Sequence, residues 1–220
     1  PFNTVKTFQI PENVEKIGKN LIGRDNVTVR FKGLTPPVFA GAPYSSNNKL
    51  KFYVPAASFR AYHLADYIEN CCVIADVPDT GTVVTGRVSN GELGYVVVSD
   101  IQPEIRTYAD VNRLIISSGT IDEQDWYAMR NMHNLVYLDL SGLSITEMPY
   151  GALEDCWQIE TVILPPTLKA IRGHAFYNTG VSDLILPDSL REITGSYNFY
   201  NCDSLRSIVI PDSVKSLPSY

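Results

Sequence analysis

The chain has 220 residues, enough for one or two domains, and its 45% hydrophobic and 19% charged residues are typical of soluble globular proteins. Its 18 basic and 24 acidic residues give a formal charge of −6 without any run of Lys or Arg, which argues against nucleic acids and anionic membranes as partners. No stretch approaches the roughly 18 consecutive apolar residues of a membrane-spanning helix, so membrane insertion is not expected.

Short apolar runs recur along the chain at nearly constant steps. They start at Val5, Val27, Leu50, Val111, Leu135, Ile159, Val181 and Leu205. The steps are 22 and 23 in the first group of three and 24, 24, 22 and 24 in the second group of five. A period of this length predicts a solenoid, in which each repeat forms one coil and buries its apolar side only against its neighbours.

A proline closes most of these runs. The positions are Pro11, Pro55, Pro165, Pro187 and Pro211. Proline donates no hydrogen bond to a strand ladder and fixes its own φ, so it ends the strand and turns the chain. The segment after the turn carries further apolar residues, such as Leu190 and Ile193, that are expected to point back inward. We therefore expect short parallel strands stacked in a coil.

The segment 71–105 lacks the period. Its runs 82–85 and 95–98 read as strands, and Ser89-Asn90-Gly91 is a strong turn signal between them. We expect a linker that includes a small hairpin capping the second array, because an uncovered coil exposes its core and its strand edge. The expected organisation is a repeat array over 1–70, a linker or capping hairpin over 71–105, and a second array over 106–220.

The repeat phrase resembles a known family. The segments "VSDLILPDSLREI" and "GHAFYNTG" resemble the BspA-like leucine-rich repeats, which are common in surface proteins of anaerobic gut and oral bacteria. Residues 111–145 resemble the start of such arrays, and residues 50–67 resemble their end. The resemblance implies a right-handed leucine-rich-repeat solenoid with few short helices, and an extracellular or cell-surface module that binds host or matrix proteins or glycans.

The end-like segment precedes the start-like segment, so either the chain carries the end of one array, a linker and the start of another, or it is a piece of something longer. The sequences at the two termini also match the repeat phrase, since "PFNTVKTFQIP" is similar to "AFYNTGVSDLILP". We therefore hypothesise that both ends belong to one interrupted array, joined across an omitted stretch or by end-to-end self-association of neighbouring chains.

Candidate chemical groups favour no enzyme. Asp79-Thr80-Gly81 spells the aspartic-protease triplet, but only one copy exists and the setting is rich in turn residues. Cys156 and Cys202 occupy one repeat position two coils apart, roughly 9 to 10 Å, which is too far for a disulfide. The three histidines show no spacing for a metal or a triad. No catalytic residue, metal or cofactor is expected.

The strand face opposite the core is the candidate binding surface. It is expected to carry two columns of side chains, one coil apart: Tyr137, Thr161, Asp183 and Ser207 in one, and Asp139, Ile163, Ile185 and Val209 in the other. Three apolar residues in the second column make a stripe of the kind that marks contacts. The alternatives are a solvated sheet face without a ligand and a chain that acts as a structural spacer or assembly unit.

Overall fold

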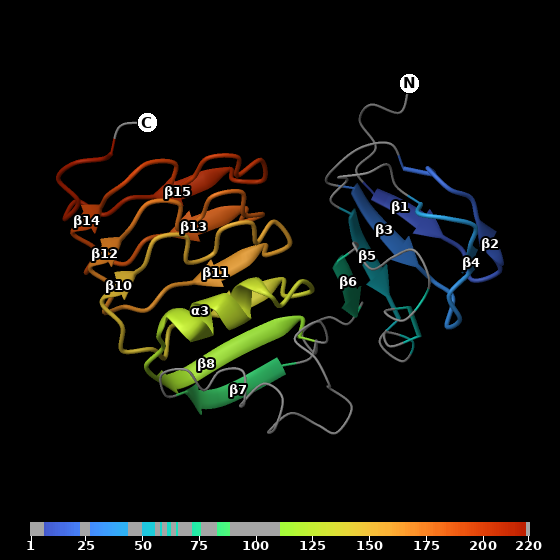
Figure 1. Cartoon of the computed structure of the whole chain (residues 1–220), viewed down its shortest axis with the longest axis horizontal. Coiled ribbons are helices and arrows are strands. Elements are labelled where there is room, and N and C mark those ends of the chain that lie inside the picture. Colours follow the sequence, from blue (N-terminus) through green and yellow to red (C-terminus); the bar gives the residue numbers. More distant parts are fainter. Residues whose placement is uncertain are drawn as a thin grey trace. The chain divides into compact units, whose positions relative to one another are not determined.

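The structure is a computed structural model that describes residues 7–22, 27–43, 50–55, 58, 61–62, 65, 72–75, 83–88 and 111–218. The chain divides into two compact units, Pro1–Gly81 and Thr82–Tyr220 (Figure 1). The division falls inside the segment that the sequence predicts to be a linker.

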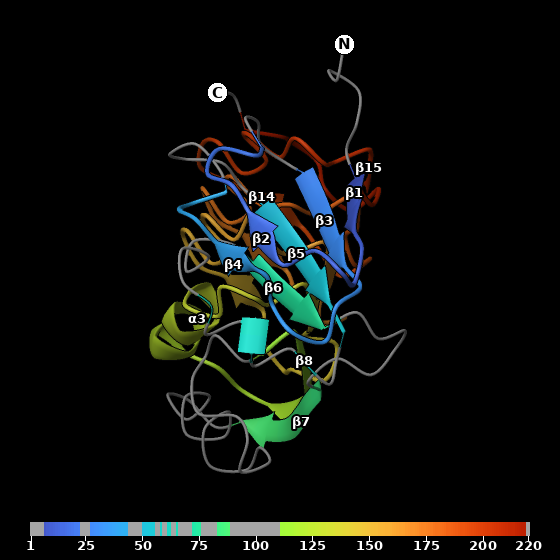
Figure 2. The same cartoon turned by 90° about the vertical axis from the view of Figure 1, so that its right-hand side faces the viewer.

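The first unit contains a sheet of four parallel strands. These are β1 (Thr7–Ile10), β3 (Val27–Phe31), β5 (Leu50–Val54) and β6 (Cys72–Ala75), in the order β1-β3-β5-β6 (Figure 2). A second, two-stranded sheet pairs β2 (Lys16–Ile17) with β4 (Val38–Phe39), also in parallel. Successive strands lie in register, with Phe8 opposite Val29 and Val29 opposite Phe52, so each repeat is one coil of a stack.

Aromatic rings fill the core of the first unit. Phe31 packs against Phe52 at 5.2 Å and against Phe39 at 6.3 Å between ring centroids, and Tyr62 lies 5.0 Å from Phe31. The Tyr62 hydroxyl donates to the carbonyl of Gly33 at 3.0 Å, and burial raises the pKa of Tyr62 to about 12. Alternation along the strands explains the arrangement, because every second side chain points to the same face.

The second unit continues the same plan with more coils. Its first sheet contains β7 (Val83–Val88), β8 (Arg113–Gly119), β9 (Tyr137–Asp139) and β11 (Thr161–Ile163), all parallel. The parallel pair β13 (Asp183–Ile185) and β15 (Ser207–Val209) follows, linked to the preceding coil by the Ser182 amide, which donates to Glu160 at 3.2 Å. A second sheet contains β10 (Glu147–Met148), β12 (Ala170–Ile171) and β14 (Glu192–Ile193).

One short helix, α3 (Glu123–Arg130), lies between β8 and β9 in the chain. Asp122 caps its N-terminus and forms a capping box with Asp125, while Trp126 and Met129 turn into the core. Strand β8 and this helix lie within residues 111–145, the segment that resembles the start of a repeat array. In the part of the chain that the structure describes, no helix is long and apolar enough to cross a membrane.

The proline corners and the apolar spine confirm the predicted coil. After Pro187, the amide of Leu190 donates to the proline carbonyl at 2.9 Å, and Pro11, Pro165 and Pro211 form the same turn. Of the apolar residues within the recurring runs, Leu138, Leu164 and Leu186 are buried, and Ile208 in the last strand is partly buried. The fold is therefore a solenoid of short parallel strands, as predicted.

The segment 71–105 contributes a strand to each unit. β6 pairs in parallel with β5, so the first stack extends past residue 70, and β7 pairs in parallel with β8. The turn at 89–91 and the second hairpin strand at 95–98 lie outside the described residues, so the capping hairpin stays a prediction.

Candidate functional site

The eight residues predicted to bind a ligand are here called the outer strand face. Parallel register places Tyr137 opposite Thr161 and Asp139 opposite Ile163, and it pairs Asp183 with Ser207 and Ile185 with Val209. β11 and β13 are neighbours in the stack, so the two columns run over four successive coils. The structure brings these side chains together as expected; their role in binding stays a prediction.

Three members of the outer strand face have local partners: Asp183 accepts a hydrogen bond from the hydroxyl of its neighbour Ser182 at 3.1 Å, and Tyr137 and Asp139 contact other parts of the array. The guanidinium of Arg113, one coil earlier, lies 4.0 Å from the centre of the Tyr137 ring, and both side chains are half-buried. The Asp139 carboxylate accepts a hydrogen bond from the Ser141 amide at 2.8 Å, which fixes the turn after β9. These two residues therefore support the structure of the face, and sequence reasoning does not foresee either contact.

The aliphatic side chains of the outer strand face are exposed. Ile163 is 38% exposed, Ile185 73% and Val209 54%, whereas the neighbouring inward positions Val162 and Leu184 are buried. Side chains alternate along a strand, so the core residues and the column lie on opposite faces of the same sheet. Three adjacent aliphatic side chains in water form an apolar stripe, as predicted.

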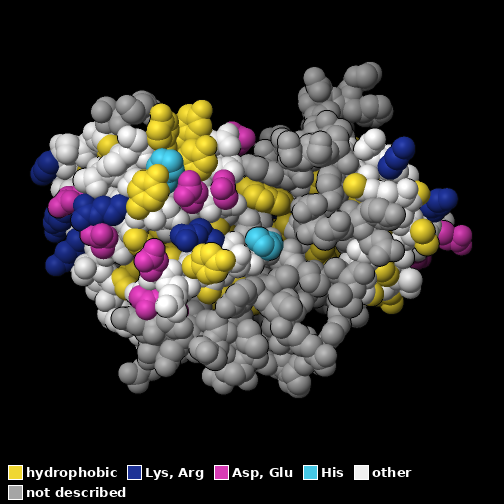
Figure 3. Space-filling view, viewed as in Figure 1, with side chains coloured by type: hydrophobic (Ala, Val, Ile, Leu, Met, Phe, Trp, Pro, Cys, Tyr) yellow, Lys and Arg dark blue, Asp and Glu magenta, His cyan; other side chains and the backbone are white. Residues whose placement is uncertain are grey.

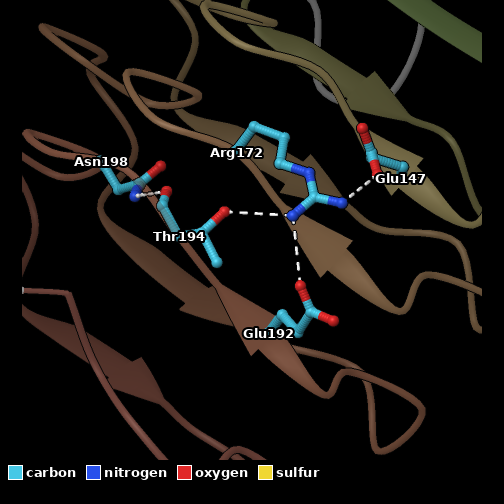
Figure 4. A network of polar contacts seen from close by, with 5 residues as sticks. All are labelled: Glu147, Arg172, Glu192, Thr194 and Asn198. Carbon is cyan, nitrogen blue, oxygen red and sulfur yellow. Dashed lines mark hydrogen bonds and ion pairs between the residues drawn. The ribbon is translucent and has the colours of Figure 1, made fainter.

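A network of ion pairs lies on the second sheet of this unit (Figure 4). Arg172 contacts Glu147 at 2.5 Å and Glu192 at 3.1 Å, so one cation joins three successive coils. Its guanidinium also donates to the Thr194 hydroxyl at 3.2 Å. The hydrogen bond from Arg172 lowers the pKa of Glu147 and raises that of Arg172. These groups are well exposed, so the network clamps the coils together weakly.

A second surface, which sequence reasoning missed, lies on the loops that close the coils. It consists of Tyr150, His174, Tyr177, Tyr197 and Tyr200, here called the aromatic ridge. In the space-filling view, hydrophobic side chains gather around a histidine on the second unit, with acidic side chains beside them (Figure 3). The sequence signal is an aromatic or imidazole ring at the same two positions of successive repeats, His174 and Tyr197 at one and Tyr177 and Tyr200 at the other; Tyr150 lies outside this pattern.

A row of polar side chains accompanies the aromatic ridge. Asn201 donates to Asn178 at 2.7 Å, and Asn178 donates to Asp155 at 2.7 Å, each step spanning 23 residues. This polar row occupies left-handed backbone, with φ of 63° at Asp155, 55° at Asn178 and 60° at Asn201. Asn and Asp tolerate that conformation better than other side chains, which explains their recurrence.

The remaining candidate groups form no chemical centre among the described residues. Cys156 and Cys202 are free thiols, and burial raises the pKa of Cys156 to about 12, so it resists ionisation. His133 is exposed, and His174 belongs to the aromatic ridge. No three His, Cys, Asp or Glu side chains gather as metal ligands in the described segments. His63 and the triplet 79–81 lie outside the described residues.

Comparison with known proteins supports the repeat assignment. Residues 106–196 match the model of the BspA type leucine rich repeat region, in 6 copies. Comparison with curated proteins finds no significant match. Among solved structures, the chain is similar to the crystal structure of a leucine rich cell surface protein from Faecalibacterium prausnitzii A2-165, with 16% identity and a TM-score of 0.38. That similarity covers 98% of this chain and 41% of the other, so the chain spans about two fifths of that protein's length.

The matched residues contain α3 and the strands from β8 to β14. Parallel strands with a period near 23 residues, proline corners and a continuous aliphatic spine account for the match in physical terms. The match to the BspA type leucine rich repeat region thus falls on residues 106–196, most of the second unit.

Proposed function

We propose that this chain is a non-enzymatic binding or adhesion module, secreted or held at a cell surface, that contacts a host or matrix protein or a glycan. The outer strand face is the proposed contact surface. The observation that carries the proposal is its contiguous apolar column, Ile163, Ile185 and Val209, exposed on a rigid stack of strands.

A flat, repetitive face of this kind suits an extended partner. Solenoids present long surfaces because each coil adds one row of side chains to the same face. Thr161, Asp183 and Ser207 flank the apolar column with hydroxyl and carboxylate groups. An apolar centre beside a polar margin is the usual anatomy of a protein contact surface.

A screen of the intact chain against matrix proteins and glycans tests the proposal. The variant Ile185→Asp places a charge in the apolar column and should reduce binding of any identified protein partner by about tenfold or more. Val38→Asp is the matched control, because Val38 is a β-branched strand residue that is 66% exposed on the other unit. Equal binding by Ile185→Asp and the unmodified chain would reject the outer strand face as the contact surface.

A second candidate function is assembly, in which the chain is a spacer or building unit that self-associates end to end. In the last described coil, Ile210 is 38% exposed and Leu217 59%, whereas the equivalent Leu186 and Ile193 in the preceding coil are buried. A second copy stacked on this coil would bury both side chains, which favours end-to-end self-association.

Sedimentation velocity over a range of concentrations tests the assembly candidate. Self-association should shift the sedimentation coefficient upward with concentration, and Leu217→Asp should suppress the shift. Leu34→Asp is the matched control, since Leu34 is 67% exposed on the first unit. A sedimentation coefficient that stays constant up to high concentration would reject self-association and favour the binding function.

A further inference from the structure

The aromatic ridge is a regular side-chain array across three successive coils. Tyr150 stacks on His174 at 4.8 Å between ring centroids, His174 stacks on Tyr177 at 5.1 Å, and Tyr177 stacks on Tyr200 at 5.7 Å. The planes of these pairs differ by 28°, 17° and 14°. Tyr197 adds an edge contact to both His174 and Tyr200. The result is a rigid ladder of nearly parallel rings.

The rings of the aromatic ridge do not fill the hydrophobic core. The neighbouring positions Leu153 and Phe176 are fully buried and fill the interior of the same coils. Three tyrosines of the ridge point into water instead, with Tyr150 64% exposed, Tyr200 51% and Tyr197 43%. Large aromatic side chains that are partly exposed to solvent are enriched at contact surfaces, because they offer apolar area together with a hydroxyl group.

The polar groups beside the ridge are already oriented. Glu154 holds His174 through a contact of 3.1 Å between Oε1 and Nδ1. The polar row Asp155, Asn178 and Asn201 is fixed by its own hydrogen bonds of 2.7 Å. Side chains that are fixed before binding lose little entropy on contact with a ligand.

The charges of these loops select the chemistry of the ligand. The segments 150–156, 173–180 and 196–203 contain the acidic residues Glu154, Asp155 and Asp203 and no Lys or Arg. Arg130 of α3 brings one positive charge to these loops, because its guanidinium donates to the Gly151 carbonyl at 2.7 Å. The three carboxylates outnumber this cation, so an anionic ligand would meet net repulsion. Carboxylate and amide oxygens accept hydrogen bonds from hydroxyl groups, and amide nitrogens donate to them, which suits a neutral polyhydroxyl compound.

We propose that the aromatic ridge binds a neutral oligosaccharide. The C–H faces of pyranose rings stack on Tyr150 and Tyr200, the two end rings of the ladder, which each have one stacking neighbour and are more than half exposed. The hydroxyl groups at the ring margins reach the carboxylate of Asp155 and the amides of the polar row. Three coils at a strand spacing of ~4.8 Å cover roughly 10 Å, the length of about two linked pyranose rings.

The ring geometry favours a sugar over a cationic side chain. A cation site needs aromatic faces that converge on one point. Here the rings of Tyr150, His174, Tyr177 and Tyr200 stack on one another, so most of their faces are covered by a neighbouring ring. Such a ladder offers an extended surface rather than a cage. This site lies on the loops, apart from the outer strand face, and does not depend on the proposed function of that face.

An oligosaccharide array tests the proposal on the intact chain, followed by saturation-transfer NMR with the sugars that bind. The array includes neutral, sialylated and sulfated oligosaccharides, with a lysine-rich peptide as a separate probe. We expect binding of neutral sugars, weakened about tenfold or more in Tyr150→Ala or Tyr200→Ala. Tyr127→Ala is the matched control, because Tyr127 is 62% exposed on α3, and it should bind like the unmodified chain.

Four results would overturn the proposal: no neutral sugar bound at millimolar concentration, binding of anionic sugars only, binding of the lysine-rich peptide only, or full retention of sugar binding in the double variant Tyr150→Ala/Tyr200→Ala. Circular dichroism on each variant checks that the coils remain folded. Retention of sugar binding by Ile185→Asp separates this site from the outer strand face, so each proposal fails or stands independently.

Discussion

The two units build the same coil from different side chains. In the first unit, aliphatic core residues surround a cluster of aromatic rings, in which Phe31 contacts Phe39, Phe52 and Tyr62. In the second, the core is mainly a long aliphatic spine to which every coil contributes several residues, among them Leu138, Leu164 and Leu186. Both units nevertheless place their strands in parallel register and turn at proline.

The difference explains why the family match covers only the second unit. A repeat model depends on the same residue type returning at the same position, and the aliphatic spine supplies that regularity. Rings of different size and direction fill the first core, so its repeats share backbone geometry with less shared sequence. The coil therefore requires apolar volume at fixed positions more than it requires leucine.

The largest expected effect comes from removing a core side chain in each unit. Phe52→Ala removes contacts with two other rings and should lower the free energy of unfolding of the first unit by about 3–5 kcal/mol. Leu184→Ala removes one aliphatic spine residue and should cost the second unit about 2–5 kcal/mol. Hydrogen exchange, measured at increasing denaturant concentration on peptides from each unit, reports the decrease in the free energy of unfolding of each unit separately.

The two core clusters share no residue, so each substitution should reduce protection mainly in its own unit. The exposed substitutions Val38→Ala in the first unit and Ile185→Ala in the second are controls and should have small effects. Equal loss of protection in both units after Phe52→Ala would contradict the division of the chain into separate cores.

The two units should also differ in the pH at which they begin to lose stability under alkaline conditions. Burial raises the pKa of Cys156 to about 12 from 9.0 and that of Tyr62 to about 12 from 10.0. Both groups stay protonated longer in the folded chain, so between these values the folded state binds more protons and stability falls as pH rises. The second unit should begin to weaken near pH 9 and the first near pH 10.

Substitution of the two groups checks this order. Cys156→Ala should remove the decrease in stability that begins near pH 9 in the second unit. Tyr62→Phe should reduce the decrease that begins near pH 10 in the first unit, although it also removes the hydrogen bond to Gly33. Unfolding followed at several pH values between 8 and 12 measures the slopes. An unchanged slope in Cys156→Ala would show that this thiol does not govern the alkaline response.

The smallest expected effect concerns the Arg172 network. Arg172→Met removes the contacts with Glu147 and Glu192, and each exposed pair should contribute about 0–1 kcal/mol. Because the pKa of Glu147 is lowered in the folded chain, its ion pair with Arg172 contributes to stability above the ordinary pKa of 4.5. This contribution decreases as the pH falls below that value. The loss should shrink in high salt, whereas Lys169→Met, at an exposed site on the same unit, should change stability less.

Much of the fold could be predicted because its signal is periodic. The runs that start at Leu135, Ile159, Val181 and Leu205 each lead into a strand, and the proline turns follow where predicted. The segment 71–105 was harder, since it has no period: β6 and β7 each pair in parallel with a neighbouring strand, a relation that composition does not reveal.

The candidate surfaces were predictable in part. Alternation along a strand was enough to place Ile163, Ile185 and Val209 on one exposed column. It could not reveal that Arg113 covers the Tyr137 ring or that Asp139 fixes a turn, because both contacts depend on side-chain direction and on the next coil. The aromatic ridge was missed because loop residues follow no simple alternation.

The sequence by itself determined the repeat, its inward leucines and isoleucines, and the turns at proline, since spacing along the chain fixes which side chains share a face. Only the tertiary structure decided which outward groups meet. The stack brings Tyr177 beside Tyr200 and Asn178 beside Asn201. Residues 23 positions apart become neighbours once the coils pack, and the direction of each side chain there depends on the backbone of the loop.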